Sequence, residues 1–204
     1  MATPVRPDVV QFGHLDIAFD SRVVRPDPGS EAQARWCRAL LESAPIGAVL
    51  ELHAGVGHVG LLTAAGTGRE LVLVEPDELA REYAVYNSAT AGMDSVHVCA
   101  EVDQAPIGGG FALIVCGSGL RGLDGLAGAC GCVRIAEEQL APGGSLVVSL
   151  DDVTGVVDLV EWLATRERDI AVQEFLRHED SVLVVLRATG RRLAEDPATD
   201  AFCS

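Results

Sequence analysis

The chain has 204 residues, of which 49% are hydrophobic and 22% charged, a composition typical of one globular domain and not of a disordered chain. Thirty acidic residues against fifteen basic ones give a net charge of −15, which argues against general nucleic-acid binding. All fifteen basic residues are arginine, so chemistry that requires a lysine amine, such as Schiff-base formation or a Walker phosphate loop, is excluded. With no apolar run long enough for a membrane helix and no signal-peptide pattern, we expect a cytoplasmic protein.

The first 45 residues predict a short appendage of strands and one helix. Residues 12–19 and 22–24 alternate in the manner of β-strands, and two prolines then break the pattern. Residues 30–44 have the apolar spacing of an amphipathic helix, which Pro45 ends.

From residue 46 to residue 188 the spacing of apolar residues switches repeatedly between strand and helix. Near-continuous apolar strands separated by helices are typical of a parallel sheet covered on both faces, and the short last connection can join only antiparallel neighbours. We therefore predict an α/β domain with a Rossmann-like, mostly parallel seven-stranded sheet, an antiparallel last strand and helices on both faces. Strands are predicted at residues 48–54, 70–75, 95–100, 111–117, 145–150, 170–176 and 182–188, and helices at 57–66, 76–92, 125–140 and 153–167. Residues 141–144 are predicted to be a turn, and residues 189–204 a flexible tail.

Six cysteines contain one C-x-C pair and no C-x-x-C pair, so neither a zinc knuckle nor a thioredoxin-type site is present. Several lie in apolar runs, where a thiol packs as a small hydrophobic group. We therefore expect no metal site and free thiols at Cys37, Cys99, Cys116, Cys130, Cys132 and Cys203.

A glycine-rich turn is predicted within residues 49–64, VLELHAGVGHVGLLTA, between the first strand of the sheet and the next helix. Gly55, Gly57 and Gly60 would let a ligand approach the backbone and the free N–H groups at the start of the helix. The spacing also fits the G-x-G-x-x-G pattern of dinucleotide-binding proteins, and a tight turn without a ligand would have the same sequence.

Two acidic residues separate these alternatives. Glu51 ends the first strand just before the glycines, where dinucleotide enzymes rarely need a carboxylate. Glu75 ends the next strand, where a carboxylate can accept hydrogen bonds from both ribose hydroxyls. With the antiparallel last strand, the chain resembles a class I S-adenosylmethionine (SAM)-dependent methyltransferase over residues 47–188. The family's first motif, (V/L)-L-(D/E)-x-G-x-G-x-G, corresponds to VLELHAGVG, in which His53 replaces the first glycine.

The resemblance implies SAM as the cofactor and suggests how it is bound. Glu51 would lie near the methionine ammonium group, the backbone of Gly55 and Gly57 would pass beneath the cofactor, and Glu75 would hold the ribose. Asn87, in the helix after Glu75, is expected to have a structural role. Pro76 and Asp77 would lie beside the adenine, and either Glu101 or Asp103 would meet the adenine amine. His53 and Cys116 are also expected on the cofactor side.

Within the family, the chain is most similar to the HemK-like, or small-domain, branch. That branch carries (N/D)-P-P-(Y/F/W) after the fourth strand to hold the nitrogen of its substrate, whereas residues 117–120 read Gly-Ser-Gly-Leu. We therefore expect methyl transfer to a small-molecule or protein acceptor by another mechanism, with the catalytic residues unassigned. Two alternatives stay open, a SAM-binding but catalytically silent partner subunit and an NAD- or nucleotide-sugar-binding oxidoreductase.

Polar residues near the predicted site supply further hypotheses. His53 and His58 flank the glycines, His14 lies in the first 45 residues, and any of them could act as a general base, although a packed or solvated role is favoured over this one. The first 45 residues are expected to cover the mouth of the cofactor site and to contribute His14, Asp16 and Arg25.

Overall fold

A computed structural model describes residues 7–107, 110–116, 125–165, 169–178 and 181–189 of the chain. The tail predicted at residues 189–204 and the Gly-Ser-Gly-Leu segment at 117–120 therefore lie outside the described residues, apart from Thr189. Its backbone N–H donates a hydrogen bond to the carbonyl of Asp169 (2.8 Å).

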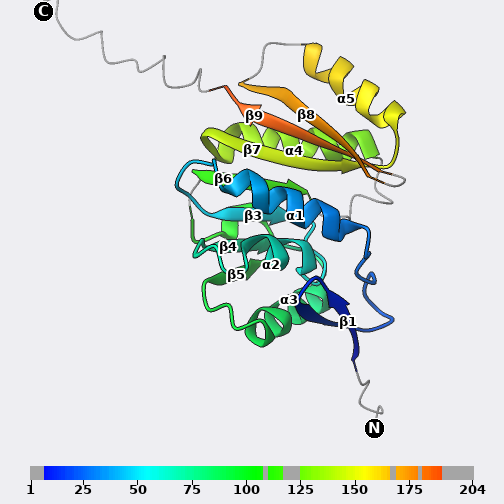
Figure 1. The fold of residues 1–204 in the computed structure, drawn as a ribbon, viewed down its shortest axis with the longest axis vertical. Coiled ribbons are helices and arrows are strands. Elements are labelled where there is room, and N and C mark those ends of the chain that lie inside the picture. Colours follow the sequence, from blue (N-terminus) through cyan, green and yellow to red (C-terminus); the bar gives the residue numbers. More distant parts are fainter. Residues whose placement is uncertain (1–6, 108–109, 117–124, 166–168, 179–180, 190–204) are drawn as a thin grey trace, which may run out of the picture.

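A seven-stranded sheet organises the fold, with the strand order β5-β4-β3-β6-β7-β9-β8 (Figure 1). The five neighbouring strands β5, β4, β3, β6 and β7 run parallel to one another. The last strand, β9, pairs antiparallel with both β7 and β8. The mostly parallel sheet with an antiparallel last strand is therefore confirmed. The strands are β3 (Val49–Leu52), β4 (Leu71–Val74), β5 (Val96–Cys99), β6 (Phe111–Cys116), β7 (Leu140–Leu150), β8 (Ile170–His178) and β9 (Ser181–Ala188).

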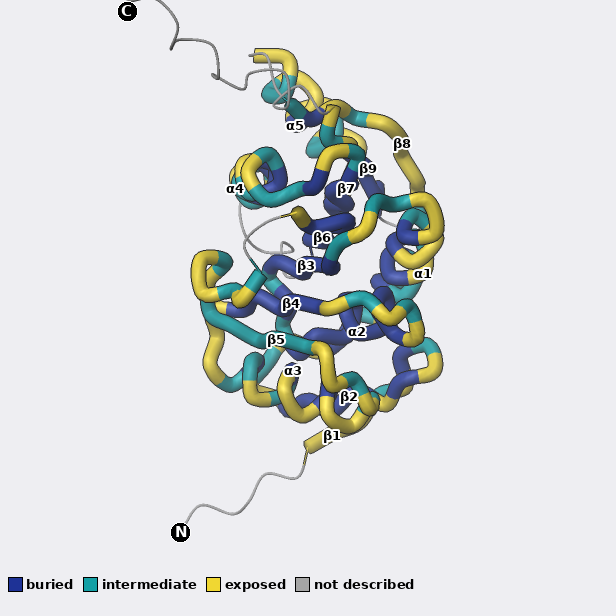
Figure 2. Tube along the Cα trace, turned by 90° about the vertical axis from the view of Figure 1, so that its left-hand side faces the viewer, coloured by how far each residue is buried: buried dark blue, intermediate teal, exposed yellow. Residues whose placement is uncertain are grey.

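Helices cover both faces of this sheet, as predicted (Figures 1 and 2). One face packs against α1 (Ser30–Leu41), α2 (His58–Ala64) and α3 (Glu78–Thr90), and the other against α4 (Gly125–Gln139) and α5 (Val153–Ala164). Every residue of β3, β4 and β6 is buried, which explains why these strands read as continuous apolar runs instead of alternating ones. None of the helices in the described ranges has the length and apolar character needed to span a membrane.

The N-terminal residues form a separate antiparallel hairpin of β1 (Asp8–Phe12) and β2 (Leu15–Phe19). The alternation predicted at residues 12–19 is interrupted by a turn at Gly13, whose φ of 61° favours glycine. A side chain there would also approach Leu62 of α2, because an added Cβ would lie 2.8 Å from its nearest atom.

The strand predicted at residues 22–24 is wrong. Asp20 accepts hydrogen bonds from the backbone N–H of Arg22 (2.8 Å) and from its guanidinium, which turns the chain at this point. The Asp20 carboxylate also accepts a hydrogen bond from the hydroxyl of Tyr83 on α3 (2.9 Å), so the turn is fixed to the rest of the fold.

The hairpin and α1 share a hydrophobic core with the sheet. Phe12 and Ile17 of the hairpin and Cys37 of α1 are buried in the same cluster as Val49 of β3 and Leu113 of β6. The hairpin and α1 therefore pack as part of the main layer structure.

Strand β7 begins at Leu140, before the start predicted at residue 145, so residues 141–144 belong to this strand and the predicted turn is wrong. The register with β6 is irregular here, between Phe111 and Leu113, which allows the strand to pass through the glycines. Gly144 approaches β6 closely, because an added Cβ would lie 2.8 Å from the carbonyl oxygen of Phe111.

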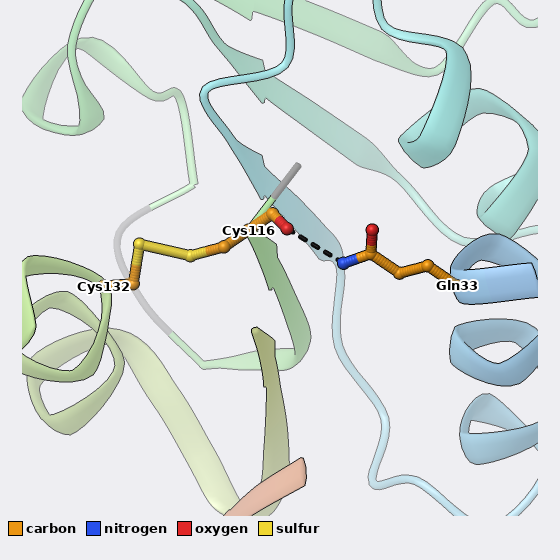
Figure 3. The surroundings of a disulfide bond; sticks show 3 residues. All are labelled: Gln33, Cys116 and Cys132. Atoms are coloured by element: carbon orange, nitrogen blue, oxygen red, sulfur yellow. Dashed lines mark hydrogen bonds between the residues drawn. A yellow bond between two sulfur atoms is a disulfide. The ribbon is translucent and has the colours of Figure 1, made fainter. Parts of the chain in front are cut away.

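The structure contains one disulfide bond among the described residues, between Cys116 at the end of β6 and Cys132 of α4 (Figure 3). The expectation of free thiols is wrong for this pair, because β6 and α4 bring together two residues 16 positions apart, a contact that local spacing does not reveal. Cys203 lies outside the described residues, and the cysteines that form no disulfide bond are Cys37, Cys99 and Cys130.

Candidate cofactor site

The candidate site lies at the carboxyl ends of β3, β4 and β6. Strand β3 has β4 on one side and β6 on the other, so the order of the strands reverses direction at β3. Open α/β sheets bind their ligands at such a switch point, outside the carboxyl ends of the strands. The predicted glycine turn follows β3 directly and therefore lies at this point of the sheet.

Alternate residues of the glycine turn adopt left-handed backbone conformations. The φ angles are 54° at His53, 54° at Gly55 and 82° at Gly57. His53 thus keeps the conformation that favours glycine at the position where the methyltransferase motif has its first glycine. The substitution that distinguishes this sequence from the motif therefore leaves the path of the backbone in the glycine conformation.

Glu51 is completely buried beneath the turn. Its Oε2 atom accepts a hydrogen bond from the backbone N–H of Gly60 (2.8 Å), and an added Cβ at Gly60 would lie 2.5 Å from the same oxygen. Its Oε1 atom accepts no hydrogen bond in the described part of the chain. The pKa of Glu51 is raised to about 8, mainly by burial; the hydrogen bond from Gly60 opposes this rise, and the nearby Glu75 carboxylate adds to it.

Glu75 holds the glycine turn from the neighbouring strand. One carboxylate oxygen accepts a hydrogen bond from the N–H of Gly55 (2.7 Å), and the other accepts one from the N–H of Asp77 (2.9 Å). The Asp77 side chain in turn caps α3 by accepting a hydrogen bond from the N–H of Ala80 (2.8 Å). The structure therefore brings together Glu51, Glu75 and the glycine turn, the central residues of the predicted site.

The residues expected around the adenine lie farther out. Pro76 is exposed, and its carbonyl accepts a hydrogen bond from the guanidinium of Arg81 (2.7 Å). Glu101 and Asp103 are both exposed after β5, in and beside the short 3₁₀ helix η1 (Val102–Gln104). The contribution of either residue to an adenine site stays a prediction.

Asn87 of α3 has the structural role that was expected. This fully buried side chain accepts a hydrogen bond from the N–H of Ala18 (2.8 Å), and it donates hydrogen bonds to the carbonyls of Ala18 and Val56 (both 3.0 Å). It therefore joins the hairpin, α3 and the glycine turn.

His58 is the first residue of α2 and packs against the hairpin. Its ring contacts Phe12 edge-on, with the ring centroids 4.9 Å apart, and neither ring nitrogen has a hydrogen-bond partner among the described residues. Burial lowers the pKa of His58 to about 4, against the opposing effect of Asp27. The packed role considered for this histidine is the one that the structure shows.

The N-terminal segment reaches the site through different residues from those predicted. His14 and Asp16 are exposed and line a hollow with Gly66 and Gly92, in the loops that precede β4 and β5, so they lie at the opposite edge of the sheet. The expectation that they cover the site is wrong, because the hairpin turn points away from the carboxyl ends. The exposed Arg25 lies over the Phe19 ring, 5.8 Å from its centroid.

Gln33 of α1 contacts the carboxyl edge of the sheet. Its buried amide nitrogen donates a hydrogen bond to the carbonyl of Cys116 (2.9 Å), as Figure 3 shows. Helical spacing places Gln33 on the buried face with Ala34 and Cys37, but it does not indicate which strand that face meets. Sequence reasoning therefore missed this contact.

Cys116 is fully buried, and its side chain is part of the disulfide bond. A role beside the cofactor stays a prediction and would have to involve its backbone. Within the described ranges, no group of three or more histidine, cysteine or acidic side chains is arranged to hold a metal ion.

No protein-family model matches the sequence, and no curated protein sequence is significantly similar to it. Solved structures do share its fold. A methyltransferase from Pyrococcus furiosus matches with a TM-score of 0.66 and 17% identity over 87% of this chain and 90% of that chain. The human methyltransferase 10 domain containing protein matches with 0.66 and 14% over 86% and 89%. TYW2 from P. horikoshii, solved in complex with MeSAdo, matches with 0.66 and 14% over 90% and 72%. The chain therefore has the fold of these methyltransferases.

Proposed function

We propose that the protein binds SAM at the carboxyl ends of β3 and β4 and transfers its methyl group to a small-molecule or protein acceptor. The observation that carries the proposal is the hydrogen bond from the N–H of Gly55 to Glu75. It joins a carboxylate placed to bind a ribose to a turn with three left-handed residues. The fold shared with methyltransferases, one of them solved with MeSAdo, supports the same assignment.

The residues present fit this cofactor. Each oxygen of Glu75 accepts one hydrogen bond from the backbone and retains a second lone pair for a ribose hydroxyl. Gly55 has open space where a side chain would be, since no atom of the described residues lies within 4 Å of an added Cβ. A ligand can therefore approach the backbone at this glycine.

Bound SAM would supply a methyl group on a sulfonium, which an acceptor takes by in-line displacement. The protein's part in such a transfer is mainly to hold the two partners in line. Glu75 provides negative charge beside the turn, and Glu51 would add negative charge beneath it once ionised, which suits a cationic cofactor. A cation near Glu51 would favour its ionised form, so we expect binding to release a proton from this buried carboxyl group.

Isothermal titration calorimetry with S-adenosylhomocysteine, SAM and NAD tests the proposal. We expect both adenosyl ligands to bind and NAD to give no heat. Glu75→Ala should weaken binding at least about 30-fold, because loss of one partner in a bidentate, charge-assisted contact costs about 2 kcal/mol. Glu78→Ala is the matched control, because this nearby acid lies exposed in the first turn of α3, and its effect should stay within about twofold.

Binding of NAD without SAM would contradict the proposal and favour an oxidoreductase. Turnover to S-adenosylhomocysteine should then be measured with small hydroxy, carboxy and thiol acceptors and with glutamine-containing release-factor peptides. We expect methylation of a member of the first group. Tight binding with no turnover on any acceptor would favour the non-catalytic alternative, and efficient glutamine methylation would contradict the expected mechanism.

A further inference from the structure

The disulfide bond joins the carboxyl edge of the sheet to the helix layer behind it. Cys116 is the last residue of β6, and Cys132 lies on the buried face of α4, so the bond crosses from a central strand to a helix (Figure 3). Their Cα atoms are 6.8 Å apart, within the range that a disulfide bond spans.

The position of Cys116 gives the bond its importance. In the sheet Cys116 lies opposite Leu52 of β3, the residue that precedes the glycine turn, and opposite Val148 of β7. Its carbonyl accepts the hydrogen bond from Gln33 of α1. The disulfide therefore adds α4 to the elements held at the end of β6, next to the switch point of the sheet.

We propose that Cys116 and Cys132 form a reversible oxidation site whose state sets how firmly the end of β6 is tied to α4. The proposal goes beyond methyl transfer and holds whichever ligand the site binds. Both residues are at most 1% exposed, so a small hydroperoxide is a better oxidant for these thiols than a bulky disulfide compound, which would need more space to reach them.

The oxidation proceeds in two steps. One thiolate attacks an oxygen of the hydroperoxide, which yields a sulfenic acid and releases water or an alcohol. The second thiol attacks the sulfenic sulfur, which forms the disulfide and releases water. Two electrons and two hydrogens thus pass from the thiols to the peroxide, and a dithiol reductant reverses the change by thiol–disulfide exchange.

Cys130 offers a matched control on the same helix. It is buried, lies two positions before Cys132 and forms no disulfide bond. Residues two apart on a helix point in different directions, so Cys130 cannot substitute for Cys132 without a change in α4.

The experiment treats the full chain with hydrogen peroxide, quenches it in denaturant with an alkylating reagent, and identifies the cysteines by mass spectrometry. We expect the peroxide-treated wild type to have two fewer alkylated thiols than the reduced wild type and to yield a peptide linking Cys116 to Cys132. Dithiothreitol should reverse both changes fully. Cys132→Ala should remove the linked peptide, and Cys130→Ala should keep it. Complete alkylation of Cys116 after oxidation, or a link between other cysteines, would overturn the proposal.

Hydrogen exchange then tests whether the disulfide bond restrains α4 at the end of β6. In the oxidised wild type, amides of α4 around Cys132 should exchange at least about tenfold more slowly than in the reduced protein, because the bond opposes local opening. Cys132→Ala should exchange equally with and without peroxide. If Cys132→Ala does not fold, Cys116→Ala serves instead. Equal exchange in both states of the wild type would refute the coupling, whether or not SAM binds.

Discussion

Replacing Glu51 with glutamine tests the effect of burying a carboxyl group beneath the glycine turn. Burial raises the pKa of Glu51 from 4.5 to about 8, so the unfolded chain loses this proton at a lower pH than the folded protein does. A group with a raised pKa in the folded state stabilises the fold below its unfolded pKa, and this stability is lost as the pH rises through the folded pKa. At about 1.4 kcal/mol per pH unit, the loss amounts to about 5 kcal/mol.

His58 has the opposite effect over part of this range. Burial lowers its pKa from 6.5 to about 4, so its contribution is present above pH 6.5 and is lost as the pH falls toward 4. The effects of Glu51 and His58 oppose each other between pH 4.5 and 6.5. Above pH 6.5 His58 no longer contributes to the pH dependence, and the effect of Glu51 remains. We therefore expect the free energy of unfolding to fall by about 2 kcal/mol between pH 6.5 and pH 8.

Urea denaturation of the wild type and Glu51→Gln between about pH 6.5 and 8.5 measures this change. The amide retains an oxygen that can accept the Gly60 hydrogen bond, but it does not titrate, so the variant should lose the decline above pH 6.5. Glu78→Gln, on the exposed first turn of α3, should keep the wild-type decline. Equal slopes for the wild type and Glu51→Gln would show that Glu51 is already ionised in the folded protein, and the reasoning from its burial would be refuted.

Two further predictions concern the glycine turn and use the same denaturation assay. Asn87→Ala should destabilise the fold by about 3 kcal/mol, because it leaves buried backbone groups of Ala18 and Val56 unpaired. Thr90→Ala, which removes an exposed hydroxyl bond on the same helix, should cost less than about 0.5 kcal/mol, and equal losses would contradict this role of Asn87. His53→Gly should stabilise by about 0.5–1 kcal/mol by relieving a left-handed conformation, whereas Ala54→Gly should destabilise; a loss at His53 would mean that its side chain makes a larger contribution.

The sheet and the central site residues could be predicted because each depends on local sequence. The strands are buried on both faces, so their apolar runs identify them without knowledge of their neighbours. Glu51 lies one residue before the end of β3 and Glu75 directly follows β4, and because these consecutive strands are parallel, both carboxylates lie toward the same edge of the sheet. The short final connection similarly requires β8 and β9 to be antiparallel.

Other contacts could not be predicted because they join distant parts of the chain. The bond from Gln33 to Cys116 depends on α1 lying beside β6, and the disulfide bond depends on the rotation of α4 about its axis. Local periodicity gives the buried face of a helix but not the strand that this face meets. The hairpin direction is a similar case, since alternation predicts strands at residues 12–19 but not the turn that carries His14 away from the site.

The glycine turn is held at three points by side chains from different elements, and this explains how it keeps its shape before any ligand is bound. Glu75 of the β4 end binds the N–H of Gly55, Asn87 of α3 binds the carbonyl of Val56, and Glu51 of β3 binds the N–H of Gly60. His53, the non-glycine residue of the turn with a left-handed backbone, carries a conformational cost, which these bonds offset. Because the turn is already fixed, a ligand that contacts its backbone does not have to order it, and more of the interaction energy contributes to affinity.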